Sequence, residues 1–149
     1  MKRLVLLAIA LVAITQFVSA QGDNPGNCGF SFVVEDGTCG DGCVSNTFTA
    51  PTTDSGYCLY CQMVRCSGNY GDCHANMTLS RSSDGAIIAT CDNLGNDHCD
   101  SPFPASQCSL TLQQGVQYKL TVCLNGCPPG YNCSNCVDCV ARAQVCRPS

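Results

Sequence analysis

The 149-residue sequence contains no tryptophan and few charged residues, which make up 12% of the chain. Its seven Lys and Arg residues form no cluster. A nucleic-acid-binding protein needs such clusters to replace the counterions on phosphate groups, so nucleic acid is excluded as a partner. A disordered acidic chain is excluded as well, because disorder accompanies low hydrophobicity, whereas 45% of these residues are hydrophobic.

A hydrophobic run long enough to span a membrane is also missing. Residues 4–13 (LVLLAIALVA) are apolar, but a transmembrane helix needs about 20 such residues. The run follows the basic start MKR and precedes the small residues of VSA at 18–20, the three-part pattern of a secretory signal peptide. A membrane anchor is the alternative. We expect cleavage after Ala20, secretion to the extracellular space and no membrane insertion.

The remaining length suits one domain. We expect residues 1–20 to be the signal peptide and residues 21–122 to form a β-rich, disulfide-bridged domain. Residues 123–149 are expected to be a cysteine-rich, loop-rich C-terminal cap of the same domain. A short helix is conceivable only near residues 137–145, since no window of twelve or more residues has a strong helical period.

Cysteine, in contrast, is abundant: the chain has 16, an even number. In an oxidising compartment this predicts a disulfide framework of up to eight bridges, whose connectivity the spacing does not reveal. The CxxC at 58–61 and the CxxCxxC at 133–139 resemble zinc or iron–sulfur ligands, but the signal peptide favours disulfides. The predicted disulfide cysteines are Cys28, Cys39, Cys43, Cys58, Cys61, Cys66, Cys73, Cys91, Cys99, Cys108, Cys123, Cys127, Cys133, Cys136, Cys139 and Cys146.

Short stretches of alternating apolar and polar residues predict a mainly β fold. Residues 77–81 and 86–90 flank an Asp84-Gly85 turn and predict a β-hairpin. In residues 118–124, Tyr118, Leu120, Val122 and Leu124 fall on one side of a strand. We therefore expect a small antiparallel β-sandwich.

The residues that catalysis would need are scarce. The two histidines, His74 and His98, lie in no hydrolase motif and are expected to be loop residues. Glu35 and Asp36 are neighbours and would point apart in a strand, so they form no carboxylate pair for sugar cleavage. The sequence predicts that the protein is not an enzyme.

Two kinds of polar motif remain. The acidic segment 92–100 offers Asp92, Asp97 and Asp100 as candidate Ca²⁺ ligands, with an ordinary exposed loop as the alternative; no other cofactor is expected. Asn76-Met77-Thr78 and Asn132-Cys133-Ser134 are N-glycosylation sequons, which would make this a glycoprotein.

Together these features predict a secreted, disulfide-stabilised, non-enzymatic extracellular protein. It would act as a structural or binding module, associated with a matrix, a coat or a cell surface, and its partner would be an extracellular protein or matrix component. A secreted effector or toxin that binds a foreign protein is the second hypothesis. A protease inhibitor is the third, with residues 45–54 as its exposed, bridge-flanked loop.

Overall fold

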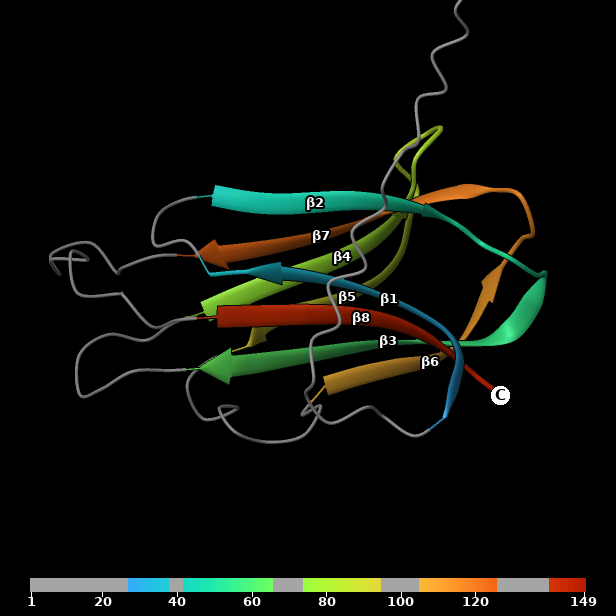
Figure 1. Ribbon diagram of the computed structural model, residues 1–149. Helices are drawn as coiled ribbons and strands as arrows, with labels where there is room; N and C mark the ends of the chain where they lie inside the picture. The colour runs from blue at the N-terminus through green and yellow to red at the C-terminus, as the bar shows by residue number, and fades with distance from the viewer. Residues whose placement is uncertain (1–26, 38–41, 66–73, 95–104, 126–139) are drawn as a thin grey trace, which may run out of the picture.

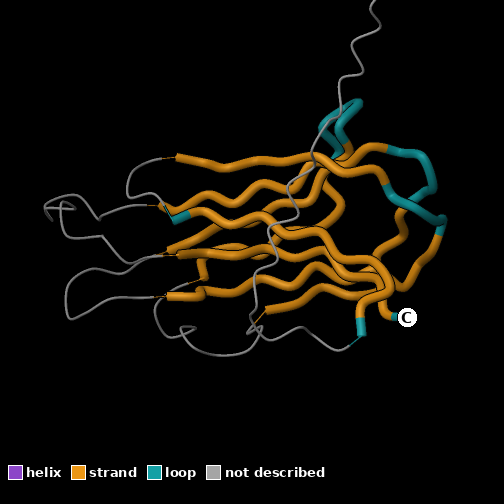
Figure 2. Tube along the Cα trace, in the orientation of Figure 1, coloured by secondary structure: helices purple, strands orange, loops and turns teal. Residues whose placement is uncertain are grey.

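The computed structural model describes residues 27–37, 42–65, 74–94, 105–125 and 140–149. The expected signal peptide, residues 1–20, lies outside the described residues. The described chain is almost entirely strand (Figure 2), and it contains no helix long and apolar enough to cross a membrane. The eight strands are β1 (Cys28–Asp36), β2 (Gly42–Thr49), β3 (Asp54–Arg65), β4 (His74–Arg81), β5 (Ile87–Leu94), β6 (Ala105–Leu112), β7 (Gln117–Asn125) and β8 (Val140–Pro148).

The strands form two four-stranded sheets in which every pair is antiparallel (Figure 1). Sheet A has the order β1-β8-β3-β6, and sheet B has the order β2-β7-β4-β5. Eight strands in two sheets of this order, in which only β4 and β5 are both consecutive in the chain and in the same sheet, make a jelly roll. The expected antiparallel β-sandwich is therefore confirmed.

The core lies between the sheets and is built by the period-two alternation of the sequence. In β7, Tyr118, Leu120, Val122 and Leu124 are all at most 4% exposed, as the pattern predicted. Sheet A contributes the fully buried Leu59. Other aliphatic and aromatic side chains of sheet A pack with Leu59 against sheet B. They include Val34, Tyr57, Met63, Leu112, Ala141, Ala143 and Val145.

The predicted hairpin is confirmed as the β4–β5 connection. Gly85 has a φ of 71°, which favours glycine, and its amide donates to the Arg81 carbonyl at 2.9 Å. Asp84 fixes the turn further, because its carboxylate accepts from the Ala86 amide at 3.1 Å and from Arg81 at 3.0 Å. Local turn chemistry was therefore sufficient to predict this pair of strands.

Where it is described, the C-terminal segment differs from the expected loop-rich cap; residues 126–139 of that cap lie outside the described residues. Residues 123–125 complete β7, and residues 140–148 form β8, an internal strand of sheet A. The possible helix near 137–145 is wrong where the chain is described, since Val140 onward is strand. The physical reason is strand pairing, because β8 pairs with β1 on one side and with β3 on the other. A local sequence pattern does not show such long-range pairing.

Candidate functional site

Three of the disulfides that the structure describes join strands within one sheet, and the fourth joins the two sheets. All eight cysteines in the described part of the chain are paired, as Cys28–Cys146, Cys58–Cys108, Cys43–Cys123 and Cys61–Cys91. The first two join strands within sheet A, and the third joins β2 to β7 within sheet B. The fourth connects β3 to β5 and so links the two sheets through the core.

This connectivity confirms disulfides over metal thiolates at the first CxxC. Cys58 and Cys61 bond to different partners, Cys108 and Cys91. The other eight predicted disulfide cysteines lie outside the described residues, and their pairing stays a prediction. They are Cys39, Cys66, Cys73, Cys99, Cys127, Cys133, Cys136 and Cys139.

The outer surface of sheet A, here called face A, consists of polar side chains tied across strands. Arg142 on β8 forms an ion pair with Glu35 on β1, and the Gln144 amide donates to the Ser31 hydroxyl at 2.8 Å. Neighbouring β3 places Tyr60 opposite Gln144 in the strand register. Face A comprises Ser31, Val33, Glu35, Tyr60, Gln62, Arg142 and Gln144.

The central side chains of face A are covered although they point away from the core. Arg142 is 9% exposed and Gln144 6%, whereas Val33 on the edge strand is 38% exposed. An arginine so enclosed requires a charge partner, and Glu35 supplies it. Face A is therefore an ordered array of side chains rather than a loose hydrated surface.

The outer surface of sheet B, here called face B, is dominated by hydroxyl groups. Ser45, Thr121, Thr78 and Thr90 follow one another in register across the four strands. The Ser45 and Thr121 hydroxyls are 2.9 Å apart, and Thr90 donates to the Asp92 carboxylate at 3.2 Å. The polar residues of face B are Ser45, Thr47, Asn76, Thr78, Ser80, Thr90, Asp92, Lys119 and Thr121, and the register partner of Ser80, Ile87, is a 67% exposed hydrophobic residue.

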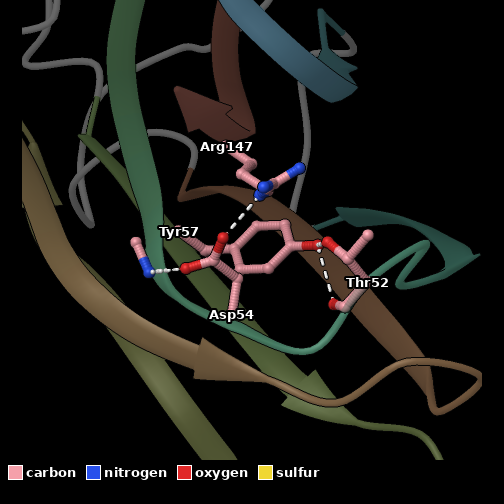
Figure 3. A network of polar contacts seen from close by, with 5 residues as sticks. Thr52, Asp54, Tyr57 and Arg147 are labelled. Atoms are coloured by element: carbon pink, nitrogen blue, oxygen red, sulfur yellow. Dashed lines mark hydrogen bonds and ion pairs between the residues drawn. The ribbon is translucent and has the colours of Figure 1, made fainter. Parts of the chain in front are cut away.

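A third polar cluster joins the start of β3 to the end of β8 (Figure 3). The Arg147 guanidinium donates to Asp54 at 2.7 Å, and the Gly56 amide donates to the same carboxylate at 2.9 Å. The Arg147 hydrogen bond, followed by that of Gly56, holds the pKa of Asp54 below its usual value. Beside it, the buried Tyr57 hydroxyl donates to the Thr52 carbonyl at 3.1 Å.

These contacts correct the expected inhibitor loop at 45–54. Residues 45–49 belong to strand β2, and Asp54 begins β3, so the connection is only residues 50–53. That connection is fastened at three points: Ala50 to Val116 and Gly115, Thr53 to Gln114, and Thr52 to Tyr57. These hydrogen bonds fix the four-residue connection to residues 114–116 and to Tyr57 of β3, so it is not a long free loop.

Those candidate catalytic and metal-binding residues that the structure describes are not brought together. Glu35 is exposed and Asp36 is 1% exposed, so the two carboxylates point apart as predicted. His74 is corrected from a loop residue to the first residue of β4, where its Nδ1 is buried without a hydrogen-bond partner. His98 lies outside the described residues.

Of the calcium candidates, Asp92 lies on β5, while Asp97 and Asp100 are outside the described residues. Within the described ranges, no three His, Cys, Asp or Glu side chains gather as a metal site would require. Of the two sequons, Asn76 lies on face B, and Asn132 is outside the described residues.

Face A is the feature that sequence reasoning missed. Its signal is the alternation Ala141-Arg142-Ala143-Gln144-Val145, in which small or apolar residues alternate with polar ones. The predicted cap concealed this period-two pattern, because the surrounding cysteines and prolines suggested loops.

Comparison with protein-family models gave no match, and comparison with curated protein sequences gave none either. Among solved structures, the chain is similar to the mitogen derived from Yersinia pseudotuberculosis. That match has 12% identity and a TM-score of 0.44, and it covers 79% of this chain and 84% of the mitogen. T=1 particles derived from infectious bursal virus give 14% identity and a TM-score of 0.27, covering 97% of this chain and 41% of that protein.

Proposed function

We propose that this protein is a secreted, non-enzymatic binding module that contacts an extracellular protein or matrix component through face A. Secretion is supported by the disulfides, because such bridges persist in oxidising compartments outside the cell. The four bridges tie strands of both sheets, so the surface that a partner would meet is rigid.

The observation that carries the proposal is the cross-strand pairing of face A. Glu35 with Arg142 and Ser31 with Gln144 hold their side chains in place before any partner arrives. Ordering a flexible side chain on binding costs about 0.5–1.5 kcal/mol, and pre-ordered side chains avoid much of that cost. Tyr and Arg are also the residue types enriched at binding hot spots, and both occur here.

Two valines on edge strands match in exposure but not in orientation, because Val44 pairs with the core residue Val122 and so lies on the inner side of its sheet. Val33 on face A is 38% exposed, and Val44 on edge strand β2 of sheet B is 39% exposed. Purified, labelled protein would be titrated onto extracellular matrix and intact cells of the producing organism. Val33→Lys is expected to weaken binding roughly tenfold, equivalent to about 1.4 kcal/mol, while Val44→Lys leaves it unchanged.

Thermal melts of both variants would establish that each is folded. Equal losses for the two variants, or no saturable binding by the wild type, would contradict the proposal. Binding confined to cells of a foreign organism would favour the effector or toxin hypothesis instead.

A further inference from the structure

The sequon at Asn76 occupies a surface that suits a carbohydrate. Asn76 and Thr78 alternate along β4 with Ala75, Met77 and Leu79, each of which is 0% exposed. Because neighbouring side chains of a strand point to opposite faces, the acceptor asparagine and its required hydroxyl residue both point outward. The bulky, hydrated group that N-glycosylation adds is compatible with the fold only in that orientation.

The surroundings of Asn76 are polar but nearly uncharged. The hydroxyls of Thr78, Thr90 and Thr121 lie on the adjacent row, and face B has one cation, Lys119, and one anion, Asp92. Hydroxyl groups donate and accept hydrogen bonds, as sugar hydroxyls do, so the two surfaces match. Face A carries one cation and one anion as well, but there the two form an ion pair, Arg142 with Glu35, and the face also holds Tyr60.

Asn76 also lies beside an accessible disulfide. Its register partner on β7 is Cys123, which is bonded to the exposed Cys43 on β2. An oligosaccharide leaving Asn76 outward would therefore start within one strand spacing, about 4.8 Å, of this bridge.

We propose that Asn76 bears an N-linked oligosaccharide that lies over face B and shields the Cys43–Cys123 bridge. The Asn76 Nδ2 atom gives up one hydrogen and bonds to the anomeric carbon of an oligosaccharide donated by a lipid pyrophosphate. The bond between that carbon and the pyrophosphate breaks, and the pyrophosphate leaves with the electron pair while the proton passes to the medium. This inference rests on the secretion part of the proposed function, because such donors act on chains entering the secretory pathway.

Transfer must precede folding, since β4 ends up between β7 and β5 as an internal strand. The finished linkage is compatible with the sheet, because the pairing of β4 with its neighbours uses main-chain groups and not the Asn76 side chain. The two proposals use opposite faces of the molecule: the glycan lies over face B, and a protein partner contacts face A.

Three variants secreted from a eukaryotic cell test the modification. Thr78→Ser retains the sequon, whereas Thr78→Val preserves the branched shape and removes it; Asn132→Gln removes the other sequon. Glycosidase that releases N-glycans converts the linked asparagine to aspartate, which peptide mass spectrometry detects. We expect aspartate at position 76 in the wild type, Thr78→Ser and Asn132→Gln proteins, and unchanged asparagine in Thr78→Val.

The rate at which the Cys43–Cys123 disulfide is reduced tests the proposed shielding by the glycan. The Cys58–Cys108 bridge on sheet A is a matched control, because it too joins neighbouring strands and has one exposed cysteine. Removing the glycan from folded protein should accelerate the reduction of Cys43–Cys123 by a small dithiol severalfold and leave that of Cys58–Cys108 unchanged. Equal acceleration of both bridges, or of neither, would refute the shielding.

The outcomes separate the two proposals. Secreted wild-type protein with unmodified Asn76 would overturn the glycan and leave the binding proposal intact. Glycosylated protein that binds no extracellular component would do the reverse. Unprocessed protein retained in the cytosol would overturn both.

Discussion

The two outer faces of this sandwich differ far more than the two inner ones. On face A an ion pair and an amide–hydroxyl hydrogen bond join β1 to β8, whereas face B consists mainly of hydroxyl groups, two of which, those of Ser45 and Thr121, lie within hydrogen-bond distance across β2 and β7. The inner faces are both lined by fully buried aliphatic and aromatic residues. Core packing constrains only every second residue of a strand, so the alternate positions are available for function.

The largest effect should come from the bridge that links the sheets. Cys61→Ala with Cys91→Ala removes that link from the core, whereas Cys43→Ala with Cys123→Ala removes a bridge from face B. The Cys43–Cys123 bridge closes the longer loop, with a sequence separation of 80 against 30 for Cys61–Cys91. Loop entropy alone would therefore make the Cys43–Cys123 bridge the more stabilising of the two, but only by about 0.9 kcal/mol. Truncation in a packed core typically costs about 2–5 kcal/mol, so the buried pair should matter more.

Urea unfolding of the two double variants, with the other bridges intact, measures this difference. A greater loss for the Cys43–Cys123 variant would show that loop entropy outweighs packing in this protein.

The inner faces are expected to be equivalent. Leu59 of sheet A and Leu120 of sheet B are both 0% exposed, and each change to alanine should lower the free energy of unfolding by about 2–5 kcal/mol. Thr121→Ala, adjacent to Leu120 but on face B, should change it by less than about 0.5 kcal/mol. Denaturant titration checks all three, and a Thr121 effect as large as that of Leu120 would contradict the assigned orientation of β7.

A smaller effect separates the outer faces themselves. Glu35→Gln removes the carboxylate from Arg142, whose side chain is only 10% exposed, and should destabilise by about 1–3 kcal/mol. Ser45→Ala breaks an exposed hydroxyl pair and should cost about 0.5 kcal/mol or less. Similar values for the two variants would mean that face A is no more ordered than face B.

The smallest expected effect is a pH dependence at the Asp54–Arg147 contact, which belongs to neither face. The folded-state pKa of Asp54 is lowered, so its stabilising contribution is complete above the unfolded-state pKa of about 3.9. It is lost as the pH falls further, through the folded-state pKa. Melting temperatures measured across acidic pH should show a shallower decline for Asp54→Asn than for the wild type; parallel curves would contradict this.

Sequence patterns predicted the elements whose signals are local. The hairpin followed from Asp84-Gly85, and the strand at 118–124 followed from strict alternation, because both depend on neighbours along the chain. The even cysteine count predicted disulfides, which are confirmed for the eight described cysteines. The expected pairing of the other eight, glycosylation at Asn132 and calcium binding at Asp97 and Asp100 stay predictions.

What needed tertiary structure was every relation between distant strands. Cys58 and Cys61 stand three residues apart, yet one is bridged within sheet A and the other reaches sheet B. Likewise, Arg142 forms an ion pair with Glu35, which lies 107 residues away in the sequence, and neither local sequence predicts this contact. Strand character, turn chemistry and the ability to form disulfides could be predicted from the sequence alone, because these properties depend on residue type and spacing. Only the tertiary structure decided which cysteines pair, that β8 is an internal strand and which polar residues share a face, because strand pairing depends on competition among all eight strands at once.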